Sequence, residues 1–336
     1  MKDFFAADAP QRQGHEVQSH FAVYSKQTRE KKDGGVYLAV VLGDRTGRIE
    51  ARIWDNCDTH GRKFEKDDVA FVRATVDAFN GKHQLKIVEI YKAAPDAYDL
   101  GDMLRVTTRK IPEMWAELRS IADSFTDPDL KRLIFAFLDD PEISHRYQSA
   151  PAAKMMHHAW IGGLLEHVID LCKFCDLSAS HFPLIHRDLL LTGAILHDIG
   201  KIYELGWKTG FEYTLEGQLI GHISIGARLL HEKIRTLPNF PERMRILVEH
   251  IILSHHGSYE FGSPKLPMIP EAVLLHYLDD AEAKMLAMQE ACAPPAAGLQ
   301  PAEYIDRVRA LDRSLVNTRQ YLENGKEESS PLGSAR

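Results

Sequence analysis

The chain has 336 residues, a formal net charge of −7, 44% hydrophobic residues and 26% charged residues. This composition is close to the average of folded globular proteins and excludes extended disorder, and the length suits two domains. The negative charge argues against a general nucleic-acid coat protein, although it leaves room for a local basic groove. The sequence contains no apolar run of membrane-helix length and no signal-like start. We therefore expect a cytoplasmic protein that does not enter a membrane.

The first 95 residues have the pattern of a β-barrel. From about Val17 to Ala93, apolar and polar residues alternate in short runs, which is the period of half-buried strands. Five strands fit, at His20–Thr28, Val36–Leu42, Arg48–Trp54, Asp68–Asp77 and His83–Tyr91. Gly34-Gly35 and Asn80-Gly81 predict hairpin turns, and Cys57–Phe64 predicts a short helix between the third and fourth strands. This order predicts a five-stranded OB barrel over residues 1–95.

From residue 96 onward, apolar residues recur at helical spacing, with prolines near the expected helix starts. The expected fold class is therefore α+β, with the small barrel followed by a larger all-α domain. Residues 96–150 predict a helical connector, residues 151–322 the domain that carries the chemistry, and residues 323–336 a disordered tail. Cys172 and Cys175 lie in one helical run, which favours two core thiols over a redox or zinc pair.

Successive helices of the second domain each place a histidine or an aspartate beside apolar residues. These residues are His167, His197-Asp198, His222, His255-His256 and Asp279. One such histidine alone is more often a hydrogen-bonded core residue, but an ordered series is costly to bury without a shared partner. Imidazoles and carboxylates on facing helices are typical of a transition-metal site in a bundle. Gly162-Gly163, before His167, predicts that another part of the chain approaches this helix closely.

Several motifs extend this pattern to a known family. They are APAAK at 150–154, HHAWIGGLLEH at 157–167, HDIGK at 197–201, SHHG at 254–257 and FGSP at 261–264. Over nearly the whole chain, the sequence resembles the YhaM-type exoribonucleases, which join an N-terminal OB fold to a domain of the HD superfamily. The resemblance implies a metal-dependent 3′-5′ exoribonuclease that hydrolyses single-stranded RNA with a metal-activated water. Glu282 departs from the related pattern, which usually has aspartate there.

The resemblance also implies roles for the individual residues. His167, His197, Asp198 and Asp279 would hold one divalent ion, and Asp198 would bridge to a second ion. His222 and His255 would hold that second ion, with His256 as a further ligand or a phosphate contact. Manganese or cobalt is favoured, while iron, nickel and magnesium stay open.

Lys201, the last residue of the HDIGK motif, and His158, in the HHAWIGGLLEH motif, are catalytic candidates together with Asp198. Lys201, one turn beyond Asp198, would neutralise a phosphate oxygen. The alternative is a solvated lysine at a helix C-terminus, where the helix dipole favours cations. His158 is a candidate for a second phosphate contact or for protonating the leaving oxygen.

The barrel offers aromatic and basic side chains for holding a single strand. The candidates are Tyr24, Tyr37, Arg48, Arg52, Phe79 and Lys82. Arg48 and Arg52 share strand parity, which favours a common groove, whereas Tyr37 and Trp54 could instead fill the barrel core. The expected partner is single-stranded RNA, with single-stranded DNA and self-association into a homo-oligomer as open alternatives.

Two other functions stay open at this point. The chain could hydrolyse nucleotides or cyclic nucleotides, or it could be a non-catalytic single-strand-binding module. A barrel lets a polymer-acting enzyme retain its substrate between cuts, which a mononucleotide does not require. The complete series of potential ligands argues against an inert module.

Overall fold

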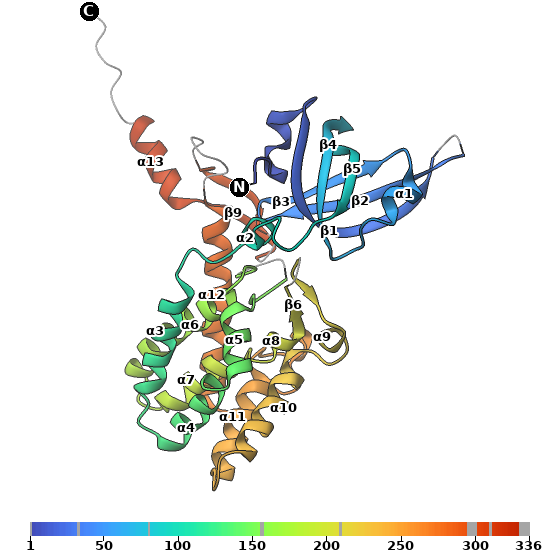
Figure 1. The fold of residues 1–336 in the computed structure, drawn as a ribbon. Coiled ribbons are helices and arrows are strands. Elements are labelled where there is room, and N and C mark those ends of the chain that lie inside the picture. The colour runs from blue at the N-terminus through green and yellow to red at the C-terminus, as the bar shows by residue number, and fades with distance from the viewer. Residues whose placement is uncertain are drawn as a thin grey trace, which may run out of the picture.

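The computed structural model describes residues 2–31, 34–79, 81–154, 158–207, 210–293, 301–308 and 311–328. The chain forms a barrel at its N-terminal end and a larger group of helices below it, while the last elements run up beside the barrel (Figure 1). The expected fold class, a five-stranded barrel followed by a helical domain, is therefore confirmed.

The barrel is closed, with the strand order β1-β2-β3-β5-β4. Its elements are η1 (Ala6–Arg12), β1 (Glu16–Glu30), β2 (Val36–Asp44), β3 (Gly47–Ile53), α1 (Cys57–Gly61), β4 (Val69–Phe79) and β5 (Lys82–Lys92). All five predicted strands are confirmed, with small shifts at their ends. The short helix is also present, but it ends at Gly61 instead of Phe64. Gly34 and Gly81 have positive φ as the turns require, whereas Asn80 lies outside the described residues.

Strand β1 closes the barrel because it pairs with β4 along its first half and with β2 along its second half. A register shift between Val23 and Ser25 bends the strand where it changes partner. Inside, side chains such as Phe21, Leu42 and Leu85 are fully buried. The outward-facing residues of β2 and β3 are thereby left free to contact a ligand.

The helical domain begins with a short turn, and aspartate-proline steps start two of its helices. Its elements are α2 (Leu100–Met103), α3 (Ile111–Asp123), α4 (Pro128–Leu138), α5 (Pro141–Ser149), α6 (Gly163–His181), α7 (Arg187–Leu196), α8 (Lys201–Glu204), β6 (Leu205–Gly206), β7 (Glu212–Tyr213), α9 (Leu215–Leu219), α10 (His222–Arg235), α11 (Glu242–Ser254), η2 (Tyr259–Phe261) and α12 (Pro270–Ala291). The carboxylates of Asp127 and Asp140 each accept two backbone N–H groups from the first turns of α4 and α5. These caps satisfy donors that a helix start leaves free.

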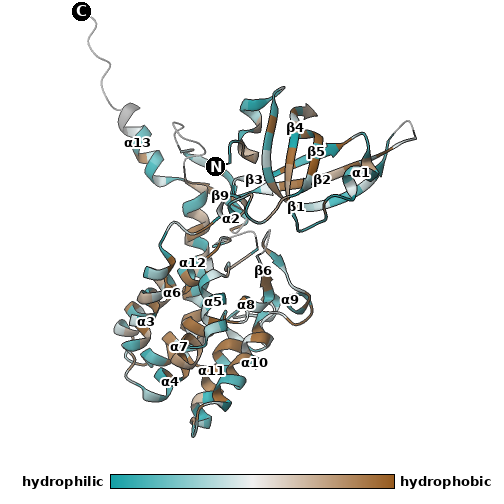
Figure 2. Cartoon of the chain, viewed as in Figure 1, coloured by the Kyte–Doolittle hydropathy of each residue, from teal (hydrophilic) through white to brown (hydrophobic). Residues whose placement is uncertain are grey.

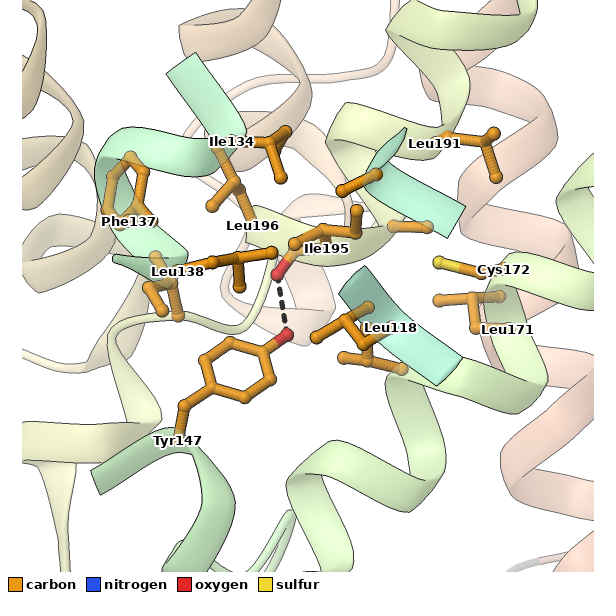
Figure 3. Packing of buried hydrophobic residues seen from close by; sticks show 14 of the residues in the cluster. Leu118, Ile134, Phe137, Leu138, Tyr147, Leu171, Cys172, Leu191, Ile195 and Leu196 are labelled. Carbon is orange, nitrogen blue, oxygen red and sulfur yellow. Dashed lines mark hydrogen bonds between the residues drawn. The ribbon is translucent and has the colours of Figure 1, made fainter. Parts of the chain in front are cut away.

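Helix α7 is the centre of this domain, since every residue from Asp188 to Leu196 is buried. A helix that is covered on all sides can be apolar all round, and the brown inner faces of the surrounding helices show what covers it (Figure 2). Tyr147 of α5 donates its hydroxyl to the Ile195 carbonyl at 2.8 Å in this core (Figure 3). Cys172 and Cys175 are buried free thiols here, as predicted.

Helices α3, α4 and α5, which the sequence assigned to a connector, contribute residues such as Leu118, Phe137 and Ile143 to this same core. They therefore belong to the helical domain itself. The C-terminal part differs from the expected helices in having a hairpin, β8 (Tyr304–Val308) and β9 (Arg313–Val316). Helix α13 (Thr318–Glu328) includes residues 323–328, which were expected to belong to a disordered tail. Residues 329–336 lie outside the described residues. No helix in the described ranges is long and apolar enough to cross a membrane.

The barrel contacts the helical domain through the β6–β7 hairpin and α2. The Lys66 ammonium lies 2.9 Å from the Glu212 carboxylate of β7, and the Arg45 backbone N–H donates to the Asp102 carbonyl. A Cβ atom on Gly210 would lie 2.8 Å from the Tyr24 ring, so the barrel packs closely on the loop between β6 and β7. These contacts place one end of the barrel above the helical domain.

Substitutions at two glycines, at the contact between α8 and α10, can test how closely these helices pack. A Cβ atom on Gly200 would lie 2.0 Å from the His222 carbonyl oxygen, whereas a Cβ atom on Gly226 meets its nearest neighbour at 3.4 Å. We expect Gly200→Ala to lower the free energy of unfolding by about 1–3 kcal/mol, because backbone atoms must move apart. Gly226→Ala, the matched control, gains up to about 1 kcal/mol of helix propensity. Urea denaturation followed by circular dichroism measures both, and equal losses would contradict this packing.

Candidate metal centre

The His197-Asp198 pair lies just beyond α7, which ends at Leu196. The chain tightens there, with i→i+3 bonds from the Ile199 N–H to the Leu196 carbonyl and from the Lys201 N–H to the Asp198 carbonyl. Adjacent residues on a regular helix would diverge by about 100°. The tighter turn instead directs both side chains to one site, where they are 0% and 4% exposed.

One group of potential ligands joins α6, the end of α7 and α12. The Nε2 atoms of His167 and His197 lie 3.4 Å apart, and Asp279 Oδ1 lies 3.3 Å from the His167 Nε2 atom. Asp198 Oδ2 lies 3.3 Å from the His197 Nε2 atom. Ligand atoms about 2.1 Å from a shared ion are separated by about 3.0–3.4 Å. His167, His197 and Asp279 therefore have the spacing of a metal site, and Asp198 lies beside His197.

A second group faces the other oxygen of Asp198. The Nε2 atoms of His222 and His255 lie 3.4 and 3.7 Å from Asp198 Oδ1. His256 joins them, since ligand atoms of His222, His255 and His256 lie within 4.8 Å of one another. Asp198 Oδ1 and the two Nε2 atoms of His222 and His255 are buried, and they have no hydrogen-bond partner among the described residues. Such a convergence of unpaired acceptors fits a cation.

The second ring nitrogen of each of these histidines is held in place. Nδ1 of His197, His255 and His256 donates to the carbonyls of Ala194, Ile252 and Phe261, and Nδ1 of His167 and His222 lies 2.9 and 3.0 Å from the carboxylates of Glu282 and Glu204. A carbonyl or an ionised carboxylate can only accept, so Nδ1 carries the hydrogen. In the neutral imidazole, each Nε2 atom then has a lone pair directed into the site, as metal-ligating histidines require.

The electrostatics of the centre favour a positive charge. Burial alone would lower the pKa of His167, but hydrogen bonds to Asp279 and Glu282 outweigh it and raise this pKa to about 10, so this imidazole carries a second proton at neutral pH until a bound cation takes that proton's place. Burial opposes ionisation of Glu282, yet hydrogen bonds to His158 and His167 lower its pKa to about 2. Burial holds the pKa of His255 well below its ordinary value, which leaves this imidazole neutral and able to ligate. Ionised carboxylates beside neutral imidazoles are a suitable ligand set for a divalent cation.

The two other catalytic candidates are placed differently. The Lys201 ammonium lies 2.6 Å from Asp198 Oδ2 with most of its side chain buried, so it belongs to the site and is not a solvated surface lysine. His158 lies behind His167, with its Nε2 atom 2.7 Å from Glu282, and it is not among the described residues that line the cavity. His158 therefore contacts Glu282 and not the described cavity, and its expected role, a phosphate contact or protonation of the leaving oxygen, stays a prediction.

A cavity of about 250 Å³ opens onto the two ligand groups. It is lined by Ala152, His167, Asp198, Lys201, His255, His256, Phe261, His276, Asp279, Asp280 and Ala283. Glu204 and His276 were not identified from the sequence, Phe261 appeared there only within the FGSP motif, and Glu282 only as a departure from the related pattern. The helical spacing could have revealed Glu282, because it lies three residues after Asp279 and so shares a helix face with it.

The barrel candidates separate into two places. The Arg52 guanidinium lies 5.9, 5.8 and 5.3 Å from the ring centres of Tyr37, Trp54 and Phe79, and Tyr37 stacks on Trp54 at 4.7 Å. Neither Tyr37 nor Trp54 belongs to the buried barrel core, so the alternative that they fill it is excluded. Lys82 is exposed and pairs with Phe79 across the last hairpin.

Tyr24 and Arg48 lie elsewhere, at the junction with the helical domain. The Arg48 guanidinium lies 3.9 Å from the centre of the Tyr24 ring. That ring packs against Gly210 of the helical domain. Arg48 and Arg52 are thus at opposite ends of β3, and the outer face of this strand leads from the aromatic cluster towards the catalytic domain.

Glu282 offers a test of the first ligand group that does not depend on turnover. Glu282→Gln removes the charge and one of the two carboxylate acceptors, which face His158 and His167, so Mn²⁺ affinity should fall about 10- to 100-fold. Isothermal titration of chelator-treated protein with Mn²⁺ measures this. Glu290→Gln, on the same helix α12 but paired with Arg105 at the surface, is the control and should leave the affinity unchanged. Equal affinities for both variants and the wild type would remove Glu282 from the site.

Comparison with known proteins agrees with this geometry. The HD domain family matches residues 164–284, and the family of OB-fold nucleic acid binding domains matches residues 23–93. The 3′-5′ exoribonuclease YhaM of Bacillus velezensis is 33% identical over 300 residues, which cover 89% of this chain and 93% of that protein. The YhaM proteins of Bacillus subtilis and of a Geobacillus species are 33% and 32% identical, again over 300 residues, and are covered to 93% and 90% of their lengths. The chain therefore belongs to the YhaM family of 3′-5′ exoribonucleases.

Proposed function

We propose that this chain is a metal-dependent 3′-5′ exoribonuclease that hydrolyses single-stranded RNA in its helical domain while the barrel holds the strand. The observation that carries the proposal is the buried Asp198 carboxylate, with one oxygen beside His197 and the other facing His222 and His255. The names of the relatives support the direction of cleavage and the choice of RNA over DNA. The barrel supports a polymeric substrate over a mononucleotide.

His167, His197, Asp198 and Asp279 would hold one divalent ion, and Asp198, His222, His255 and His256 would hold a second. Two such ions supply a nucleophilic water near neutral pH and neutralise charge on the scissile phosphate. The mixture of imidazole and carboxylate favours Mn²⁺ or Co²⁺ over Mg²⁺, which prefers oxygen ligands.

The residues of the chain support hydrolysis without a covalent step. Among the described residues that line the cavity, none is a serine, threonine or cysteine that could attack the phosphate. Lys201 carries a positive charge beside Asp198 and is placed to neutralise a phosphate oxygen. Burial opposes this charge, but the neighbouring Asp198 outweighs it and raises the pKa of Lys201, so the ammonium persists at neutral pH.

The direct experiment uses a single-stranded RNA of about 20 nucleotides labelled at its 5′ end, incubated with the protein and Mn²⁺. A 3′-5′ exonuclease produces a descending ladder of labelled fragments, which a chelator stops. Parallel lanes with Co²⁺, with Mg²⁺ and with DNA of the same sequence test the metal and the sugar preference. Immediate release of the labelled 5′ nucleotide, or no cleavage of either strand, would overturn the proposal.

Asp198 links both ligand groups, so Asp198→Ala should remove hydrolysis. We expect no detectable ladder and a lower content of bound Mn²⁺. RNA binding, measured by fluorescence anisotropy, should stay within about twofold of the wild type because the barrel is unchanged. Asp176→Ala, an exposed aspartate on α6 that pairs with Arg187, is the control and should cleave normally. Normal turnover by Asp198→Ala would contradict the metal mechanism.

Arg52 tests the proposed role of the barrel. Arg52→Ala should weaken binding of a long single strand and reduce the magnitude of the slope of log affinity against log salt by about 0.7–1, as expected for one lost phosphate contact. Hydrolysis of a dinucleotide, which is too short to reach both domains, should be unchanged. The control is Arg73→Ala on β4, where the arginine pairs with Glu16 and Glu89 on another part of the barrel. An equal loss with short and long substrates would exclude this groove.

A further inference from the structure

A rigid loop displays a large aromatic side chain at the mouth of the catalytic cavity. Phe261 lines the cavity together with Asp198, Lys201 and His256, yet 69% of its surface is exposed to solvent. Exposing a phenyl ring on a soluble protein gives no gain in folding free energy, because burial is what stabilises an apolar side chain. An exposed aromatic beside a phosphate-binding centre therefore suggests a contact with substrate.

The loop around Phe261 is held in one conformation. The Phe261 carbonyl accepts the Nδ1–H of His256 at 2.8 Å, and the Phe261 N–H donates to the Ser258 carbonyl. Gly262 adopts a φ of 81°, which a residue with a side chain rarely tolerates. The buried Ser263 hydroxyl donates its hydrogen to the Lys265 carbonyl at 2.7 Å, and the Leu253 carbonyl oxygen lies 3.2 Å away. The backbone that orients a ligand histidine is thus the same backbone that positions the exposed ring.

The size of the cavity determines which part of a nucleotide can enter it. Sites that enclose a whole small molecule commonly measure about 300–1,000 Å³, whereas this cavity measures about 250 Å³ and must also hold the ions. The charged lining from Asp198, Lys201 and His256 suits a phosphate. A base attached to that phosphate has to lie at the mouth, where Phe261 is exposed.

We propose that Phe261 is a stacking platform for the base of the 3′-terminal nucleotide, a subsite that rests on the proposed exonuclease function. Stacking on an aromatic side chain accepts every base, since each base has a π-face. This contact holds the last nucleotide while its phosphate lies at the ligand groups. It also suits an enzyme that removes residues one after another without regard to sequence.

Tyr259 provides a matched control within the same short helix η2. It is 61% exposed, but it does not line the cavity. If the exposed aromatic residues of this loop acted only through nonspecific hydrophobic contacts or through loop stability, Tyr259→Ala and Phe261→Ala would lower the rate of hydrolysis to a similar extent. A specific platform requires that Phe261 alone matters.

The test compares RNA substrates that carry either a normal or an abasic 3′-terminal nucleotide. Removal of the first nucleotide is followed under single-turnover conditions at subsaturating protein. Phe261→Ala should lower kcat/KM about 5- to 150-fold on normal RNA, the equivalent of about 1–3 kcal/mol for one stacked base. On the abasic RNA, the wild type should already be slow and Phe261→Ala should change the rate little. Phe261→Trp should restore most of the rate on normal RNA.

Mn²⁺ titration and thermal denaturation of each variant serve as folding controls, and both should match the wild type because the backbone contact to His256 is retained. An unchanged rate for Phe261→Ala, or an equal loss on normal and abasic RNA, would overturn the platform. If wild-type protein produces no ladder on any RNA, the proposed function itself fails. A normal wild-type ladder together with an unaffected Phe261→Ala variant rejects only the stacking subsite.

Discussion

The burial of one carboxylate governs the architecture of the catalytic domain. Asp198 is 4% exposed, and an isolated charge so far from water costs several kcal/mol unless opposite charge lies close. Lys201 provides that charge at Oδ2, while Oδ1 faces only imidazole nitrogens that have no hydrogen to donate. A cation at Oδ1 satisfies an oxygen that nothing in the described part of the chain satisfies. A cation at Asp198 would therefore both stabilise the fold and take part in the proposed chemistry.

The same local hydrogen bond recurs at two of the histidines around Asp198. His197 and His255 each follow the end of a helix, and each donates Nδ1–H to the carbonyl three residues earlier. Helix ends leave such carbonyls without intrahelical partners, so the same bond completes the helix and orients the ligand. The contact at Gly200 then sets the distance between the backbones that carry Asp198 and His222. Ligand geometry is thus fixed largely by the backbone.

Local patterns in the sequence predicted most of the fold and the order of the candidate ligands. Alternation predicted the five strands, and the expected HD and OB domains are confirmed by family matches. Contacts between distant segments could not be predicted from local patterns. Glu204 and Glu282 contact His222 and His167 only because folding brings these residues together. The contact between His158 and Glu282 was inaccessible for the same reason, since the two residues are 124 positions apart in the sequence. The assignment of ligand roles stays a prediction.

The small cavity also limits which RNA ends the enzyme can process. With the phosphate in a cavity of about 250 Å³ and the base at its mouth, as proposed above, the exposed ring needs a base face that is not already stacked within a helix. A base-paired 3′ end presents two strands, and its terminal base is held by its partner. An RNA that ends in a stable stem would therefore resist decay, whereas one with a short unpaired overhang would be trimmed back to the stem. The dimensions of the site would therefore make the lifetime of a transcript depend on the secondary structure at its 3′ end.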